Sequence, residues 1–498
     1  MKDVALHLSS TLDQILASIP LVKPEFALIA AFLLSIVATL FTDRLWKQSS
    51  FFVSIIGYLV SFVYLLPQLH QPTSAFFGML VIDNFSVFAR GIILFALLIS
   101  TIFIQQHFKG KIFQKNLGDV YTVLLTAGLG LNLLTITTNW LLAFIAIETV
   151  SISSYILVGY FSTHKKQSEA AMKYVLFGSV CAAVMLYGLS LLYGFTGNLD
   201  FVSPAHLQGL AAAPQVMTSI ALLFVFTGIG FKLSFVPFHA WAPDVYEGAP
   251  TPVTAFLSTV PKVGAIVLLA RITQAWASSL FYFGELTILF LTVVAIVTML
   301  AGNLIALRQQ NVKRMMAYSS IGHTGFLLMA VLVAPSENPS ILLFYLAAYV
   351  LMNLAAFAFI DSLEHKTGAT TLESYSGLGK KLPIVFTCFT FIGIALIGLP
   401  PTAGFVGKLL VFTSVFESYQ SSGDLPYLLL LITGALTSVI SLFYYFKIPL
   451  YAFLRDGQSD HNINTPIRFI IAIGIVLTAL VFGIGIFPDF LLGLFQSR

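Results

Sequence analysis

Charged side chains are scarce in this chain. They account for 9% of its 498 residues, whereas about 25% is usual in a soluble domain. Hydrophobic residues account for 58%, and the mean hydropathy is +0.93. So few charges could not cover the surface of a soluble globular protein of this size. The composition therefore indicates a polytopic membrane protein.

Cysteine is almost absent as well. The chain has two, Cys181 and Cys388, far apart in apolar stretches. Two cysteines exclude a disulfide framework and cannot hold an iron–sulfur cluster by themselves. The sequence also lacks a Gly-rich nucleotide loop, a Cys-x-x-Cys-His motif, a clear intramembrane histidine pair and a basic nucleic-acid patch. We therefore expect this chain to hold no redox cofactor and no metal, and to bind no nucleic acid.

Long apolar runs, in contrast, fill most of the sequence. A membrane span needs about 20 apolar residues, and in lipid only a helix satisfies its own backbone hydrogen bonds. We therefore expect an all-α fold of about fourteen transmembrane helices. They lie at 24–41, 51–67, 79–104, 119–137, 139–161, 169–194, 216–235, 251–275, 285–306, 318–334, 340–362, 383–416, 426–452 and 466–494.

Basic residues alternate between successive loops. They follow spans 1, 3, 5, 9, 11 and 13, as Arg44, Lys47, Lys109, Lys111, Lys115, Lys165, Lys166, Arg308, Lys313, Arg314, Lys366, Lys380, Lys381 and Arg455. Loops without Lys or Arg are 67–78, 195–215, 335–339 and 417–425. The positive-inside rule then places both termini on the outer face. The exception is loop 236–250, which should be cytoplasmic but carries Asp244 and Glu247 and no basic residue.

Two of the expected spans contain helix breakers close to a lysine. Two glycines and Pro237 surround Lys232 in span 7, and Pro400 and Pro401 precede Lys408 in span 12. Proline removes a helix hydrogen bond, so both spans should be broken. Because they are five spans apart, they cross the membrane in opposite directions, which is typical of inverted five-helix repeats, spans 4–8 and 9–13. The predicted organisation is three N-terminal helices at 1–118, the first repeat at 119–275, the second at 285–452 and a last helix at 466–498.

Four ionisable residues lie deep inside expected spans: Glu148, Lys232, Lys262 and Lys408. Each costs at least ~2.5–3.5 kcal/mol to insert at the bilayer centre, so we interpret them as a candidate proton relay. A Glu–Lys contact at ~4 Å and an effective dielectric of ~20 contributes ~4 kcal/mol. Moving one charge across 100 mV costs ~2.3 kcal/mol, so forming and breaking one pair could drive a proton step. The alternatives are static structural pairs or lysines that reach the interface.

Several other ionisable residues are weaker candidates. Lys173 could join the relay or cap the cytoplasmic end of its helix. His323 could carry protons or pack as a neutral side chain, and His239 could carry protons but lies nearer the cytoplasmic surface. Glu25 and Asp83, at the ends of spans, fit an interfacial or structural role better.

Four long motifs carry a family resemblance. They are 169–174 (EAAMKY), 230–258 (GFKLSFVPFHAWAPDVYEGAPTPVTAFLS), 302–323 (GNLIALRQQNVKRMMAYSSIGH) and 398–405 (GLPPTAGF). Through these motifs, essentially the whole chain resembles the antiporter-like subunits of respiratory complex I. The resemblance implies fourteen helices with inverted repeats around a hydrophilic axis. In that axis Glu148 and Lys232 would form the input pair, Lys262 the central relay base and Lys408 the terminal base.

Within the family, the chain most resembles the N-type subunits. Lys408 stands where M-type subunits have a glutamate, and Lys262 is the base expected in span 8 of an N-type chain. The sequence also ends about four residues after span 14, where L-type subunits append a long lateral helix.

The resemblance implies a proton-translocating subunit of a bacterial inner-membrane NADH:quinone oxidoreductase. FMN, iron–sulfur clusters and quinone would belong to other subunits, and the partners would be neighbouring membrane and peripheral subunits and lipid. Three alternatives stay open from the sequence. They are a multi-subunit Mrp-type cation/proton antiporter, a ferredoxin-fed photosynthetic homologue, and a scaffold whose lysines are locked in static pairs.

Overall fold

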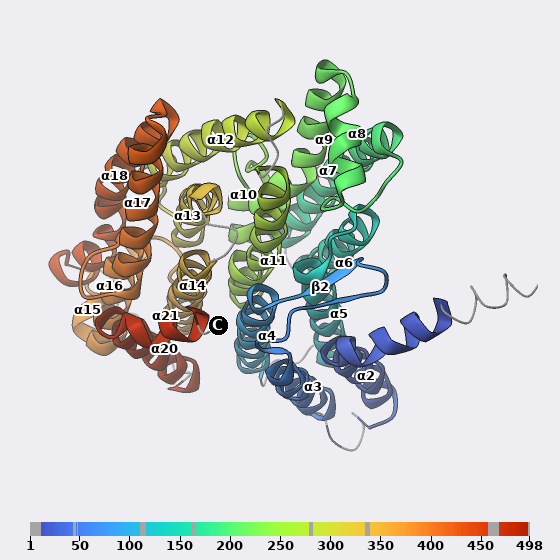
Figure 1. The fold of residues 1–498 in the computed structure, drawn as a ribbon. Helices are drawn as coiled ribbons and strands as arrows, with labels where there is room; N and C mark the ends of the chain where they lie inside the picture. Colours follow the sequence, from blue (N-terminus) through green and yellow to red (C-terminus); the bar gives the residue numbers. More distant parts are fainter. Residues whose placement is uncertain are drawn as a thin grey trace, which may run out of the picture.

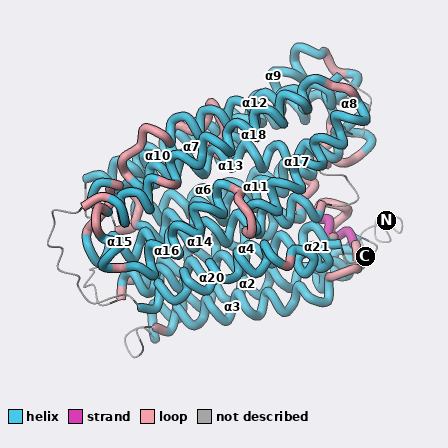
Figure 2. The backbone as a smooth tube through the Cα atoms, turned by 90° about the vertical axis from the view of Figure 1, so that its left-hand side faces the viewer, coloured by secondary structure: helices cyan, strands magenta, loops and turns pink. Residues whose placement is uncertain are grey.

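The computed structural model describes residues 11–42, 46, 48–109, 116–161, 165–277, 282–333, 339–456 and 468–496. Nearly all of them are helical, and the long helices run side by side along one direction (Figures 1 and 2). The long helices are α2 (Lys23–Val37), α3 (Ser49–Leu65), α4 (Asn84–Phe108), α5 (Leu117–Ile136), α6 (Trp140–Gly159), α7 (Lys165–Thr196), α9 (Gln215–Leu233), α11 (Thr251–Ala277), α12 (Tyr282–Ala306), α13 (Val312–Val333), α14 (Ser340–Thr367), α16 (Pro383–Ile397), α17 (Ala403–Ser422), α18 (Leu425–Tyr445) and α20 (Arg468–Ile486).

Short elements lie at the two ends of this bundle (Figure 2). Helices α10 (Trp241–Gly248) and α15 (Leu378–Lys381) lie at one end, together with the described basic residues at the starts of α7 and α13. We call this the basic end. Helices α8 (Pro204–Ala212) and α21 (Pro488–Gln496) and the hairpin of β1 (Thr73–Ala75) and β2 (Leu80–Ile82) lie at the opposite end. Four residues of the predicted charge pattern, Arg44, Lys47, Lys111 and Lys115, lie outside the described residues.

The predicted all-α, polytopic fold is confirmed. The described part of the chain has thirteen helices long and apolar enough to cross a membrane, and each overlaps one expected span. The remaining expected span, 383–416, consists of α16 and α17 with a non-helical segment between them. Helices α11 and α14 occupy the middle of the bundle, where almost every side chain is buried (Figure 1).

The break near Lys232 lies later in the chain than its glycines suggest. Helix α9 continues unbroken through Gly228 and Gly230 and ends at Leu233. Both glycines permit close packing instead, since a Cβ on Gly228 would lie 2.4 Å from the sulfur of Met185. Ser234 then takes a left-handed conformation, with φ of 56°. Lys232 is therefore in the last turn of a helix that ends inside the protein.

The break in span 12 has a similar backbone pattern. Helix α16 ends at Gly398, which is left-handed with φ of 89°, and the Thr402 side chain caps the start of α17. In both breaks a proline follows three residues after the left-handed residue. The two lysines nevertheless differ in their position relative to the break. Lys232 precedes its break in the sequence, whereas Lys408 follows its break. That the two halves are inverted repeats remains a prediction.

Two of the expected span ends that were wrong have a clear local cause. Span 3 was expected from residue 79, but 80–82 form β2 and α4 begins at Asn84, because the Asp83 carboxylate accepts the Ser86 backbone N–H and fixes the helix start there. Span 14 was expected as one helix to residue 494, but α20 ends at Ile486 and α21 starts at Pro488. A proline lacks the N–H that would continue the first helix.

Two ion pairs, one buried and one partly exposed, join helices near the end opposite the basic end. Arg90 of α4, 0% exposed, donates to Glu25 of α2 at 3.0 Å and to the Gln68 side chain at 2.7 Å. Arg271 of α11 binds both carboxylate oxygens of Asp83, at 2.7 and 3.0 Å. Glu25 and Asp83 thus lie in ion pairs with Arg90 and Arg271, partners that no sequence pattern indicates.

Removing Arg90 alone should destabilise the protein, because Glu25 would then be a buried charge without a partner. We expect Arg90→Met to lower the free energy of unfolding by about 3–5 kcal/mol. The double variant Glu25→Leu, Arg90→Met should recover most of that loss, since no charge remains buried. Thermal denaturation of the purified protein in detergent measures both. A double variant no more stable than the single one would contradict the ion-pair explanation.

Candidate functional site

Lys262 lies at the centre of the bundle, on α11, and is 1% exposed. Its ammonium donates to the Ser320 carbonyl at 2.9 Å, to the Ser320 hydroxyl at 2.7 Å and to the Thr324 hydroxyl at 2.8 Å. These three bonds use all three donors of an ammonium group. All the acceptors are neutral and come from α13, so neutral oxygens rather than a carboxylate stabilise Lys262.

The acceptors of Lys262 are themselves connected to other helices. The Thr324 hydroxyl also donates to the Leu233 carbonyl at 2.9 Å, at the end of α9 and next to Lys232. The Ser320 and Tyr349 hydroxyls are 2.7 Å apart, and the Tyr349 hydroxyl donates to the Ser258 carbonyl at 2.8 Å. The surroundings of Lys262 thus connect α9, α11, α13 and α14 through polar groups.

Lys232 differs from Lys262 in having no hydrogen bond. It is 4% exposed, and its ammonium contacts no hydrogen-bond acceptor among the described residues. Glu148 of α6 is half-buried, and its carboxylate accepts the Ser151 hydroxyl at 3.3 Å. Glu148 and Lys232 interact electrostatically, although no carboxylate oxygen lies within 4.0 Å of the ammonium in the described structure. The predicted pair therefore interacts electrostatically but makes no direct contact.

Lys408 of α17 reaches back across the helix break. Its ammonium donates to the carbonyls of Ile397 at 2.8 Å and Leu396 at 3.3 Å, and it lies 4.4 Å from the centre of the Phe326 ring. These carbonyls belong to the last turn of α16, whose oxygens lack helical partners and form the negative end of the helix dipole. The break thus supplies acceptors for a charge at membrane depth.

His323 lies between the two lysines, on the same helix as the acceptors of Lys262. Its Nδ1 is 2.9 Å from the Tyr345 hydroxyl, and it is buried in the electrostatic field of both Lys262 and Lys408. The structure thus brings together Lys232, Lys262, His323 and Lys408 in one row, with Glu148 at its α6 end.

Sequence reasoning missed the hydroxyl groups that connect this row. Ser320, His323 and Thr324 follow the spacing i, i+3, i+4, so they share one face of α13. That spacing was a usable signal for a polar helix face in an apolar span. The tyrosines of α14, Tyr345 and Tyr349, are also four residues apart, but tyrosine is common in apolar cores and carries less information.

The secondary candidates near the basic end lie outside this row. Lys173 is half-exposed and pairs with Glu169 at 2.8 Å and Asp244 at 2.7 Å. Arg314 of α13 pairs with Asp244 at 2.6 Å and Glu247 at 3.0 Å. Basic residues of α7 and α13 therefore balance the acids of loop 236–250, which explains how this loop lies at the basic end without a Lys or Arg of its own.

His239 lies in the turn between α9 and α10. It is half-buried, and its Nδ1 has no hydrogen-bond partner among the described residues. Burial lowers the pKa of His239, so the neutral form is favoured in the folded protein.

These features define a class of protein: a polytopic helical membrane protein with a row of buried ionisable groups between two helix breaks. Residues 137–441 match the model of the family described as NADH:quinone oxidoreductase/Mrp antiporter, transmembrane. The chain belongs to this family.

Curated relatives match most of the chain. It is 37% identical over 481 residues to NADH-quinone oxidoreductase subunit N 2 of Chloroherpeton thalassium, covering 93% of this chain and 92% of the relative. It is 38% identical over 450 residues to NAD(P)H-quinone oxidoreductase subunit 2 of Thermosynechococcus vestitus, covering 88% and 82%.

Solved structures share the fold. A chain of respiratory complex I from Thermus thermophilus superposes with a TM-score of 0.78 and 28% identity, over 95% of this chain and 99% of that one. A chain of the Mrp complex from Dietzia matches with a TM-score of 0.76 and 19% identity, over 95% of each chain, which shows the shared fold alone.

The ion pairs of Asp244 make the folding stability of the protein depend on pH. Partial burial raises the pKa of this carboxyl, but hydrogen bonds and ion pairs with Lys173 and Arg314 outweigh burial and hold the pKa below its usual range. A depressed folded pKa stabilises the protein above the unfolded pKa of about 4, and the stabilisation is lost as pH falls through the folded value.

We therefore expect Asp244→Asn to lower the melting temperature by a constant amount between about pH 7 and pH 5, and by less and less below about pH 4. Melting curves across this range, recorded in detergent, measure the difference. Asp424→Asn is the matched control, since Asp424 is exposed and its side chain makes no cap bond at α18. A difference for Asp244→Asn that grew as the pH fell would contradict the assignment.

Proposed function

We propose that this chain is the N-type, proton-translocating membrane subunit of an NADH:quinone oxidoreductase. The observation that carries the proposal is the row of buried ionisable groups from Glu148 to Lys408, connected by hydroxyls of α13 and α14. Electron transfer from NADH to quinone occurs on other subunits, which hold FMN, iron–sulfur clusters and quinone. This chain performs no redox step and moves protons in response.

In this proposal Glu148 and Lys232 form a switchable pair. Closing their gap to a contact of ~4 Å at an effective dielectric of ~20 contributes ~4 kcal/mol. That exceeds the ~2.3 kcal/mol needed to move one charge across 100 mV. Lys232 has no hydrogen bond to lose among the described residues, so its ammonium gains the full contact when it meets Glu148. Lys262 then serves as the central base and Lys408 as the terminal base.

His323 is positioned to pass a proton between Lys262 and Lys408. Its Tyr345 contact and its position between the two lysines support that role. Lys173 lies in ion pairs with Glu169 and Asp244, and His239 lies in the turn before α10, so we assign neither residue to the relay.

Two alternatives receive less support. The Mrp complex shares the fold at 19% identity, whereas the quinone-oxidoreductase relatives reach 37% over 93% of the chain. A scaffold with statically paired lysines does not fit the geometry, because Lys232, Lys262 and Lys408 have no carboxylate within 4.0 Å in the described structure. A locked ion pair needs such a partner.

The same proposal predicts how the chain is oriented in the membrane and which molecules lie next to it. The positive-inside rule directs the basic end to the cytoplasm and both termini to the outer side of a bacterial inner membrane. The chain functions inside a multi-subunit membrane complex, beside further antiporter-like subunits, with lipid around its outer helices.

Removing the Glu148 carboxylate should stop coupling without stopping assembly. We expect Glu148→Ala to reduce NADH-driven proton pumping about 10²-fold, since a positioned proton-transfer group contributes about 10²–10⁴. Glu148→Asp, which keeps the acid, should retain a measurable part. Dye-quenching in inverted membrane vesicles measures pumping, and blue-native electrophoresis checks assembly. Normal pumping by an assembled Glu148→Ala complex would refute the assigned role.

A further inference from the structure

A groove runs along the surface of the bundle between α2 and α3, which pack side by side at one edge (Figures 1 and 2). Its volume is about 510 Å³, which lies within the range of about 300–1,000 Å³ for sites that hold small organic ligands. Apart from Lys23 and Tyr64, only apolar residues line it. We call it the α2–α3 groove.

Small residues make the α2–α3 groove hollow. A Cβ added to Gly57 of α3 would lie 2.4 Å from the Cβ of Ala31 on α2, so the two helices touch there and form the floor. Ala27 and Ala30 of α2 also line the groove, and their short side chains leave the space above this floor open. Within a membrane, such an apolar hollow is filled by lipid chains or by another apolar helix.

The length of the α2–α3 groove matches one leaflet of a bilayer. Its lining covers 23–34 on α2 and 53–64 on α3, and each range rises about 16 Å as a helix. One leaflet is about 15 Å thick, half of the hydrocarbon core. Nearer the basic end, the Thr39 and Ser50 hydroxyls lie 2.9 Å apart and join the two segments. A lipid chain of one leaflet fits this length, whereas a neighbouring transmembrane helix would contact both leaflets.

Both polar residues of the groove lie at its end away from the basic end. Lys23 is the first residue of α2, and Tyr64 is in the last turn of α3. The Gln68 side chain holds these two helix ends together, because it donates to the Leu21 carbonyl at 2.8 Å. Lysine and tyrosine commonly place their polar tips in the headgroup layer of a bilayer. The groove therefore has one polar end and an apolar length, as a phospholipid does.

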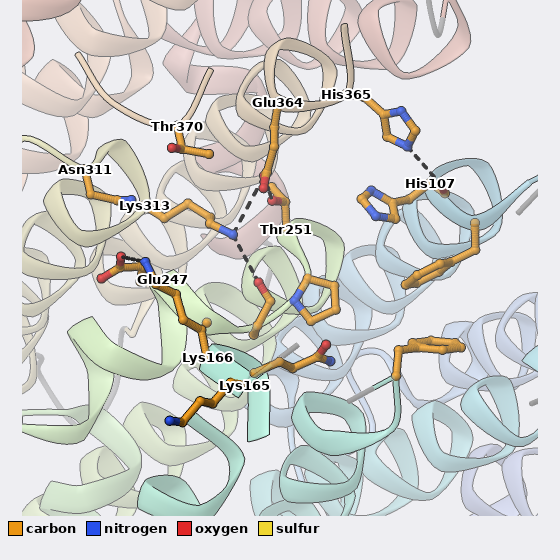
Figure 3. Close-up of a pocket in the computed structure, with 16 residues that line it drawn as sticks. His107, Lys165, Lys166, Glu247, Thr251, Asn311, Lys313, Glu364, His365 and Thr370 are labelled. Carbon is orange, nitrogen blue, oxygen red and sulfur yellow. Dashed lines mark hydrogen bonds and ion pairs between the residues drawn. The ribbon is translucent and has the colours of Figure 1, made fainter. Parts of the chain in front are cut away.

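Lys23 is a charge that lacks a counter-charge. It is exposed, and its ammonium forms no ion pair with any described residue. The other described basic residues near this end, Arg90 and Arg271, each pair with an acid. At the basic end, Lys313 also lies near an acid, 3.7 Å from Glu364 (Figure 3). Because the positive-inside rule disfavours lysine at the end where Lys23 lies, an anion bound there would explain its presence.

We propose that the α2–α3 groove binds an anionic phospholipid, with one acyl chain along the two helices and the phosphate on the Lys23 ammonium. The Tyr64 hydroxyl supplies a second donor at the same end. The lipid belongs to the leaflet opposite the basic end. The site is separate from the row of residues from Glu148 to Lys408, and it requires no proton transfer.

Lys23→Gln removes the charge and keeps a side chain of similar polarity. We expect it to lower the occupancy of the groove by anionic lipid about fivefold, the contribution of one lysine near an anionic membrane surface. Lys23→Arg should keep the wild-type occupancy. Lys381→Gln is the matched control, because Lys381 is an exposed lysine of α15 at the basic end.

Ala30→Phe tests the apolar part of the site, because a phenylalanine side chain fills the hollow. We expect it to lower the occupancy by anionic and zwitterionic lipid alike. The matched control is Ala435→Phe, since Ala435 is an exposed alanine of α18, away from the groove.

The measurement is photo-cross-linking in membrane vesicles that contain the assembled complex. The probe is phosphatidylglycerol with a photoreactive group in one acyl chain, and peptide mass spectrometry locates the labelled residues. Wild-type protein should be labelled within 23–34 and 53–64, and less by phosphatidylcholine with the same chain. Equal labelling by the two lipids, or labelling that neither Lys23→Gln nor Ala30→Phe reduces, would overturn the proposal. A disulfide between Ala30→Cys and another subunit would also overturn it, because a protein helix would then fill the groove.

Discussion

An ammonium group at membrane depth needs oxygen acceptors, and much of this structure provides them. Charges cost several kcal/mol in a low-dielectric interior unless hydrogen bonds or opposite charges compensate. Helix α13 supplies acceptors to Lys262 through the hydroxyls of Ser320 and Thr324. The break between α16 and α17 exposes backbone carbonyls that bind Lys408. The helix breaks and the hydroxyl-bearing helix faces are therefore two solutions to one energetic constraint.

The three lysines differ in how well this constraint is met. Lys262 has three neutral acceptors, Lys408 has the end of a helix, and Lys232 has no hydrogen bond within the part of the chain that the structure describes. A buried ammonium without acceptors is the least stable arrangement, so Lys232 is the group whose environment changes at the lowest cost. It also lies beside the carbonyl of Leu233, which the acceptor Thr324 binds. A movement at the end of α9 would therefore shift the Thr324 hydroxyl, which also accepts a hydrogen bond from Lys262.

The sequence predicted the spans and the four deep charges because both depend on local composition. Apolar runs of about 20 residues set the helices, and a charge inside such a run is visible without a structure. It did not predict that Gly228 serves packing rather than a break, since the neighbour that fills its space, Met185, is more than forty residues away. The acceptors of Lys262 and the partner of Glu25 could not be predicted for the same reason. Such contacts join residues from distant spans, and single-chain periodicity contains no information about which spans meet.

The direct test of the account is the number of protons pumped per NADH oxidised by the assembled complex with Lys262→Met. Methionine keeps the apolar length of the side chain but removes the base, so packing is largely retained while the centre of the row is lost. Simultaneous recording of NADH absorbance and proton release in vesicles gives the ratio. The account predicts a markedly lower ratio than wild type in a complex that still assembles. An unchanged ratio would show that protons do not pass through Lys262 and would contradict it.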